Sequence, residues 1–240
     1  MGSSADCRKI FDFRLKASRY EIALITEGLS EHSIIKHIVT KYFKDADPEI
    51  NQIQPRLIDG RQDQRTPGGW NEVLKYCEQP DIQDILIESD CLIAQIDTDQ
   101  SEQPAFGVSH TRTDNQPRSV GELCQAVIHR LKGAMLPDTL ARYESRIFFA
   151  VCVHTIECWL LPVFYTDARR HKTHNCLDTL NDALRKRDSR IITATNENEP
   201  NGRRLYAAAL SQWRKRQDIR ASAQYNEGFA LLLDALEALG

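Results

Sequence analysis

Acidic residues follow two apolar segments of this chain, and they are the residues best suited to chemistry. One apolar run ends in Glu27 and Gly28, and a second run, residues 92–96, ends in Asp97 and Asp99. On an extended segment, the side chains of Asp97 and Asp99 project to the same face, ~7 Å apart along the chain. Mg²⁺ and Mn²⁺ prefer carboxylate oxygens, and a cation held there offsets charge on a phosphate and lowers the pKa of bound water. This pattern predicts a divalent-cation-dependent phosphoryl-transfer site.

Each acidic residue has a specific expected role. Asp97 and Asp99 are expected to bind the metal, and Glu27 to orient a water, act as general base or bind a second metal. Glu31, in the first turn of a helix, either adds a ligand or complements the positive end of the helix dipole. Glu157 follows another apolar strand and is either a ligand or a helix N-terminal acid. We therefore expect Glu27, Asp97 and Asp99 to be catalytic, and Glu157 and Glu31 to join them as metal ligands.

The spacing of apolar residues predicts the strands and helices that position these acidic residues. Strands are expected over residues 20–27, 51–58, 91–96 and 146–154, with a helix after Ser30, whose hydroxyl is expected to cap it. Strands alternating with helices predict an α/β fold with a mostly parallel sheet covered on both faces. Because the carboxyl ends of parallel strands meet at one edge, the acidic residues should converge there.

The chain divides into three expected parts. Residues 1–19 form a polar N-terminal arm, residues 20–162 an α/β core, and residues 163–240 a helical extension packed on that core. Within the core, Ser119 and Glu122 have the spacing of a capping box that starts a helix. The extension shows helical signals over residues 177–187 and 204–216 and in a final amphipathic stretch.

Two polar loops carry arginines suited to phosphate. Arg61 and Arg65 lie in the first loop, and Arg112 and Arg118 lie in the second, which runs from residue 99 to 118 and also contains His110. These guanidinium groups either contact a nucleic-acid backbone or are simply solvated. Residues 167–220 carry 13 Lys/Arg against 7 Asp/Glu, although the whole chain has a net charge of −3. This basic segment suits a polyanion, a docking partner or a solvated helical face.

The motifs together resemble a known family. Glu27-Gly28 on one strand and Asp97-Thr98-Asp99 on a later one resemble the TOPRIM domain, whose hallmark is a Glu and an Asp-x-Asp motif in a small Rossmann-like fold. The form Glu-Gly-x-Ser-Glu is similar to that of OLD-like and small stand-alone TOPRIM nucleases. The stretch from Glu157 to Leu161 also resembles the Glu-x-Trp-Leu-Leu sequence of those proteins. The resemblance covers roughly residues 20–162.

This resemblance implies a Mg²⁺- or Mn²⁺-dependent nuclease that cleaves phosphodiester bonds in DNA or RNA, associated with defence against phages or mobile elements. No Walker A motif is present, so any ATPase would be a separate subunit. A different class of function is a non-catalytic regulatory subunit that keeps the fold and docks an ATPase or other partner. A metal-dependent nucleotidyl or small-molecule phosphoryl transferase is a third option. A homo-oligomer is compatible with each.

Bulk properties fit a globular protein. The chain is 41% hydrophobic and 27% charged, with neither an apolar signal region nor a stretch long enough for a membrane helix. Seven cysteines without a regular framework are expected to be reduced thiols, which indicates a cytoplasmic location. His171, His174 and Cys176, with Cys152, His154 or Cys158, offer an alternative zinc site whose spacing matches no standard finger.

Overall fold

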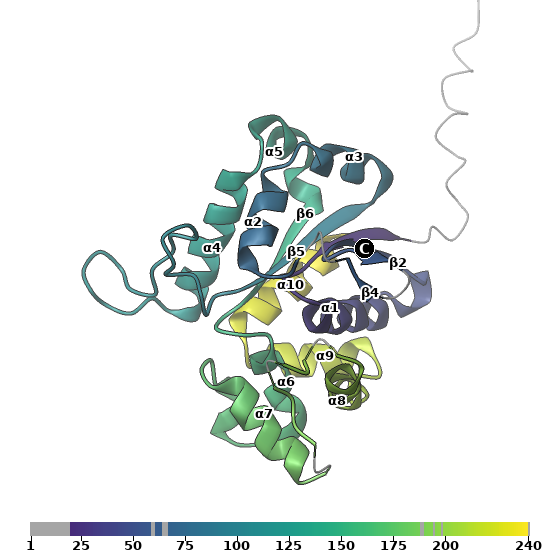
Figure 1. The fold of residues 1–240 in the computed structure, drawn as a ribbon, viewed down its shortest axis with the longest axis vertical. Helices are drawn as coiled ribbons and strands as arrows, with labels where there is room; N and C mark the ends of the chain where they lie inside the picture. Colours follow the sequence, from purple (N-terminus) through teal and green to yellow (C-terminus); the bar gives the residue numbers. More distant parts are fainter. Residues whose placement is uncertain are drawn as a thin grey trace, which may run out of the picture.

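A four-stranded parallel sheet forms the centre of the protein, in the order β2-β1-β5-β6 (Figure 1). The computed structural model describes residues 20–58, 61–63, 67–187, 190–193, 195–197 and 199–239. The strands of this sheet are β1 (Glu21–Ile25), β2 (Glu49–Gln54), β5 (Cys91–Asp97) and β6 (Ile147–Cys152). The predicted α/β class with a parallel sheet is therefore confirmed, and the expected arm, residues 1–19, lies outside the described residues.

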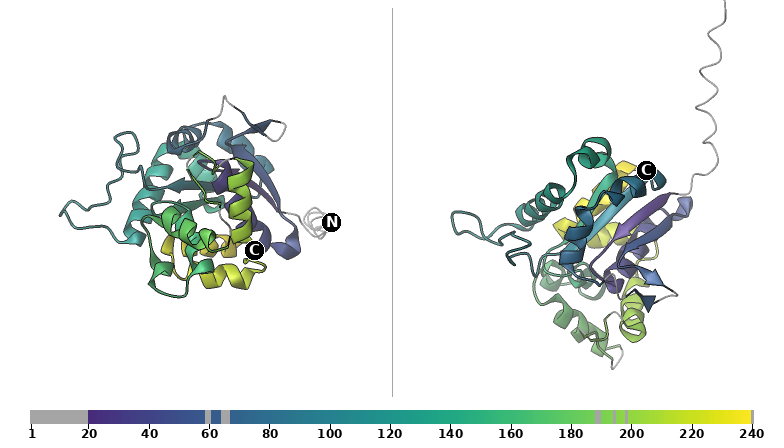
Figure 2. Two further views of the ribbon diagram at one scale, coloured as in Figure 1. Left: turned by 60° about the horizontal axis from the view of Figure 1, so that its bottom comes forward. Right: turned by 45° about the horizontal axis from the view of Figure 1, so that its top comes forward.

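Helices cover both faces of this sheet. The helices of the described residues are α1 (Leu29–Tyr42), α2 (Trp70–Cys77), α3 (Asp81–Glu88), α4 (Val120–Ala134), α5 (Pro137–Tyr143), α6 (Glu157–Phe164), α7 (Cys176–Arg185), α8 (Pro200–Leu210), α9 (Arg216–Ala223) and α10 (Glu227–Leu239). Of these, α7 packs on α6 rather than on the sheet (Figure 1). Figure 2 shows the sheet between these layers from two further sides. None of the helices within the described ranges is long and apolar enough to span a membrane.

Two hydrophobic cores lie on opposite faces of the sheet because successive strand residues point to opposite sides. Ile22 and Leu24 of β1 face the core built by α1 and the helices from α6 to α10. Ala23 and Ile25 face the core built by α2, α3 and α4. Strands β5 and β6 are buried along their whole length, as expected for parallel strands covered on both sides.

Local boundaries differ from expectation in three places. Gly28, in extended conformation, precedes α1 without a side-chain cap, and the Ser30 hydroxyl donates instead to the Glu31 carboxylate at 3.0 Å. The expected second strand ends at Gln54, and a short antiparallel pair follows, β3 (Leu57–Ile58) and β4 (Arg61–Gln62). The helical signal of residues 204–216 belongs to the end of α8 and the start of α9. The capping box of Ser119 and Glu122 is present at α4.

The C-terminal segment contributes to the core on the α1 side. Helix α10 packs against β6, and Phe229, Leu232 and Leu236 are fully buried in that core. Helix α8 packs against α1, and α1 begins at the carboxyl edge of the sheet, directly after β1. The connection between α7 and α8 therefore lies at this edge. The extension therefore borders the edge at which the acidic residues are expected to meet.

Candidate functional site

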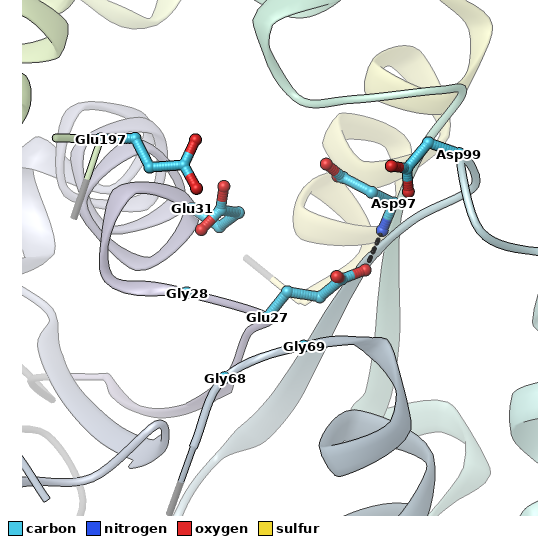
Figure 3. Close-up of a pocket in the computed structure, with 8 residues that line it drawn as sticks. All are labelled: Glu27, Gly28, Glu31, Gly68, Gly69, Asp97, Asp99 and Glu197. Atoms are coloured by element: carbon cyan, nitrogen blue, oxygen red, sulfur yellow. Dashed lines mark hydrogen bonds between the residues drawn. The ribbon is translucent and has the colours of Figure 1, made fainter. Parts of the chain in front are cut away.

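Glu27 and Asp97 meet at the carboxyl edge of the sheet. Strands β1 and β5 are hydrogen-bonded neighbours, and Glu27 follows the first while Asp97 ends the second. The main-chain N–H of Asp97 donates a 2.6 Å hydrogen bond to Oε1 of Glu27 (Figure 3). Asp99, two residues further on, lines the same cavity. The convergence expected from the topology is present for these three residues.

A buried glutamine joins the two strand ends. The main-chain N–H of Glu27 donates to Oε1 of Gln95 at 3.1 Å, and Nε2 of Gln95 donates to Oδ1 of Asp97 at 2.8 Å. Gln95 is fully buried, so these bonds satisfy polar groups that would otherwise be costly in the core. Sequence reasoning missed this residue, although one amide within the apolar run of residues 92–96 was a visible signal.

The acidic residues border a cavity of about 280 Å³. Its lining consists of Glu27, Gly28, Glu31, Gly68, Gly69, Asp97, Asp99 and Glu197. Gly69 donates its N–H to the Glu27 carbonyl at 2.8 Å, which holds the loop before α2 against the end of β1. At Gly68 an added Cβ would overlap the same carbonyl oxygen. A glycine at position 68 is therefore required for this close approach of two backbone segments.

A second group of carboxylates lies across the cavity. The side chains of Glu31 and Glu197 point toward each other, opposite Asp97 and Asp99 (Figure 3). Glu157, the first residue of α6, is 4% exposed, and one of its oxygens accepts a hydrogen bond from the hydroxyl of Tyr206. Glu157 does not line the cavity but is close enough to raise the pKa of both Glu31 and Glu197. The structure thus brings Glu31 to the cavity itself and places Glu157 next to it, paired with Tyr206.

Glu197 and Tyr206 are site residues that sequence reasoning missed. Both come from the C-terminal extension, well beyond the last recognised motif. The connection between α7 and α8 carries Glu197 to the cavity, and α8 carries Tyr206 to Glu157. Neither sits at the end of a predicted strand, so no local sequence signal distinguished them from surface positions.

Burial and mutual repulsion raise the pKa values of these carboxyl groups. Burial is the largest cause at Glu27, whose pKa rises to about 8, with repulsion from Glu31 and Asp99 adding to it. Burial, followed by repulsion from neighbouring carboxylates, also raises the pKa of Glu31 to about 7. The pKa of Asp97 is raised well above its usual range, first by burial and then by Glu27. Such a cluster is stabilised by protons or by a cation.

The carboxylate oxygens of this cavity are suitable ligands for Mg²⁺ or Mn²⁺, which prefer such oxygens and keep several bound waters. Among the described residues, however, no three His, Cys, Asp or Glu side chains are already arranged as a ligand group. Asp97 and Asp99 on one side and Glu31 on the other would have to approach one another around a bound ion. Glu27 is held by the Asp97 N–H and faces the space between them.

Arg112 and Arg118 do not line this cavity. Arg112 forms ion pairs with Asp114 and Glu122, and Arg118 donates to the Ser109 carbonyl at 3.0 Å. The loop that carries them projects from the body of the protein between β5 and α4 (Figures 1 and 2). Arg61 lies in β4, where only its backbone is described, and Arg65 lies outside the described residues. The described contacts of Arg112 and Arg118 therefore give no support to their expected phosphate-binding role, and the side chains of Arg61 and Arg65 lie outside the described residues.

Histidines gather beside Asp99 instead. The rings of His154 and His174 lie with their centroids 3.8 Å apart, and the ring of His110 lies 5.6 Å from that of His154. Burial lowers the pKa of His154, and the neighbouring rings of His174 and His110 lower it further, against the opposing effect of Asp99. Sequence reasoning placed His154 and His174 only in a zinc alternative.

That zinc alternative is wrong as far as Cys158 and Cys176 are concerned. These two residues form a disulfide that joins the start of α6 to the start of α7, so neither sulfur is free to bind zinc. The ring of His171 packs edge-on against Tyr225. The expectation of reduced thiols is wrong for this pair. Among the described residues, the buried free thiols are Cys77, Cys91, Cys124 and Cys152.

Comparison of the chain with protein-family models, with curated proteins and with solved structures returned no match, so the site rests on its own geometry.

Proposed function

We propose that this protein is a divalent-cation-dependent phosphodiesterase that cleaves DNA or RNA, of the kind that the TOPRIM resemblance implies. The observation that carries the proposal is the placement of Glu27 against Asp97, with Asp99 beside them, at the carboxyl edge of a parallel sheet. This edge is where open α/β sheets place their sites. The raised pKa values support the same function, because perturbed carboxyl groups in a cavity are characteristic of catalytic centres.

In this proposal each residue of the site has its own role in hydrolysis. Asp97 and Asp99 hold Mg²⁺ or Mn²⁺, with Glu31 and Glu157 as further candidate ligands. Such an ion, when bound, neutralises phosphate charge and lowers the pKa of a coordinated water. Glu27 positions the attacking water or takes its proton, and the Asp97 N–H fixes the direction of its carboxylate. Water adds to phosphorus as one P–O ester bond breaks, and the departing oxygen acquires a proton.

A role in defence against phages or mobile elements, and an ATPase as partner subunit, rest on the family resemblance alone. The Rossmann-like arrangement of the sheet is compatible with that resemblance.

The proposal is tested by incubating the purified chain with plasmid, single-stranded DNA and RNA in Mg²⁺ or Mn²⁺. We expect cleavage that EDTA abolishes and that an Asp97→Ala/Asp99→Ala variant lacks. An Asp81→Ala/Asp84→Ala variant is the matched control, because these two acids are exposed on α3. Cleavage that survives the loss of Asp97 and Asp99 would refute the proposal. No cleavage of any substrate would favour the docking subunit.

A further inference from the structure

A cluster of three histidines lies next to the carboxylate cavity, on the side of Asp99. His110 comes from the loop between β5 and α4, His154 follows β6, and His174 precedes α7. We propose that His154 and His174 form a binding site for a backbone phosphate of the nucleic-acid substrate, adjacent to the phosphate that is cleaved. This inference rests on the proposed function and adds the surface on which the substrate is held.

The backbone of His154 is fixed to the Asp-x-Asp segment. Its N–H donates to the Thr98 hydroxyl at 2.8 Å, and its carbonyl accepts from the N–H groups of Thr98 and Asp99 at 3.0 and 3.2 Å. His154 also has a φ of 60°, a left-handed conformation that is unfavourable for a non-glycine residue and that these bonds hold in place. These bonds hold the backbone of His154 beside that of Asp99, so the His154 side chain starts from a fixed point next to the carboxylate cavity.

The side chains of this pair have unused hydrogen-bonding capacity. Within the described part of the chain, the ring nitrogens of His154 make no hydrogen bond, and those of His174 make one, between Nδ1 and the Thr173 hydroxyl at 2.9 Å. A neutral imidazole always carries one N–H donor, so each ring can donate to a phosphate oxygen. His174 is exposed and His154 is half-buried, so an extended ligand can reach both.

His110 acts as a positioning residue for this pair. Its Nε2 lies 2.9 Å from the Thr98 carbonyl and 3.0 Å from the Ser101 hydroxyl. Because a carbonyl only accepts, Nε2 carries the proton and is occupied by the protein itself. The His110 ring then stands edge-on to His154, and the loop is held against Thr98.

A phosphate suits this cluster because of the groups around it. Three imidazoles, which carry N–H donors and no negative charge, lie together here, whereas the carboxylates lie in the neighbouring cavity. A phosphodiester approaching those carboxylates is repelled unless donors hold it on another side. The two arginines described in the long loop are engaged with Asp114, Glu122 and Ser109. The histidine pair therefore offers donors beside the cavity that the described contacts leave unused.

The test measures binding separately from cleavage. A fluorescein-labelled single-stranded oligonucleotide is titrated with the full chain in Ca²⁺, and anisotropy gives Kd. We expect His174→Ala to raise Kd about tenfold, the effect of losing one hydrogen bond to a charged group. His174→Gln, which keeps an N–H donor, should recover most of the affinity. His129→Ala is the matched control, since His129 is exposed on α4.

A chemical change in the ligand locates the contact. Oligonucleotides that carry one neutral methylphosphonate at successive positions are titrated against the wild type and His174→Ala. We expect one position to weaken binding to the wild type but to cause no further loss in the variant, because both changes remove the same interaction. Additive losses at every position would overturn the inference.

The outcomes separate this inference from the proposed function. Cleavage with unchanged Kd for His174→Ala and for His154→Ala refutes the histidine site and leaves the nuclease intact. Binding that depends on His174 without any cleavage supports the histidine site and refutes the nuclease. If His174→Ala abolishes binding of Zn²⁺ and leaves oligonucleotide binding unchanged, the cluster is a metal site and the inference is wrong.

Discussion

The main-chain N–H of Asp97 donates to the carboxylate of Glu27 across two adjacent parallel strands, at a distance of 2.6 Å. This bond joins the two sequence motifs of the site directly. It holds the Glu27 carboxylate at the border of the cavity (Figure 3), where the backbone of Trp70 also helps to lower its pKa against the effect of burial. The predictions below follow from this bond and from the groups around it.

Replacing Glu27 by glutamine separates its charge from its hydrogen bond. In Glu27→Gln the amide oxygen of the new side chain can still accept from the Asp97 N–H, so the fold should be kept while the carboxylate is lost. We expect the cleavage rate to fall about 10²–10⁴-fold, the usual contribution of a positioned acid or base. Initial rates on a labelled oligonucleotide measure the effect. Glu78→Gln, at an exposed position after α2, should cleave normally; an equal loss in both variants would point to a general effect of charge.

Adding a methyl group at Gly68 should disturb the site through the backbone. Because the new Cβ would overlap the Glu27 carbonyl oxygen, the loop and the end of β1 must move apart. We expect Gly68→Ala to lose about 1–3 kcal/mol of unfolding free energy, as in other overpacked sites, and to lose activity.

Gly133 provides the matched comparison for that substitution. It lies in α4, and a Cβ there meets nothing within 4 Å. Gly133→Ala should leave cleavage unchanged and stabilise the protein by at most about 1 kcal/mol, the difference in helix propensity. Urea denaturation and cleavage rates test both. Full activity in Gly68→Ala would show that the close approach to Glu27 is unimportant.

Stability should fall as pH rises through the neutral range. The pKa values of Glu27 and Glu31 are raised from 4.5 to about 8 and about 7, mainly by burial. The folded state therefore holds protons that the unfolded chain has already released, and unfolding becomes easier with rising pH. For these groups the loss begins near pH 4.5 and is complete above about pH 8. Melting temperatures measured from pH 5 to pH 9 should decline accordingly.

Mg²⁺ should reverse that decline. A cation that binds the ionised carboxylates of the folded state stabilises it by mass action, and it does so more strongly at high pH, where these groups are ionised. We expect the rise in melting temperature with millimolar Mg²⁺ to be larger at pH 8.5 than at pH 5.5. In Asp97→Asn this difference should shrink. An equal rise at both pH values would argue against binding at the carboxylates.

Removing the Tyr206 hydroxyl should destabilise the second carboxylate group. This hydroxyl donates to Glu157, and both side chains are buried. Tyr206→Phe leaves a buried carboxylate without its donor, which should cost about 1–3 kcal/mol in unfolding free energy. Tyr143→Phe is the control, since Tyr143 is only partly buried and its ring contact with Arg146 does not need the hydroxyl. Equal stabilities of the two variants would exclude a structural role for the Tyr206–Glu157 bond.

The sequence alone was sufficient for the sheet and for its acidic edge. Apolar runs of strand length, each followed by a helical period, allow one main arrangement, a parallel sheet with helices on both faces. Because parallel strands have their carboxyl ends at one edge of the sheet, the sequence placed Glu27 and Asp97 at the same edge. The structure then showed that β1 and β5 are neighbours there. This part was predictable because it depends on apolar patterns within about fifteen residues and on the common direction of parallel strands.

The tertiary structure alone decided which distant residues complete the site. Gln95 links the strand ends because its buried amide has no water to bond with and pairs with protein groups instead. Glu197 and Tyr206 come from a C-terminal segment whose position depends on side-chain packing against α1 and α6. The tertiary structure also placed His174 against His154 and paired Arg112 with Glu122 at the start of α4. Such contacts join residues far apart in sequence, and no local periodicity encodes them. Their positions follow from the shapes of the packed elements, which exist only once the chain has folded.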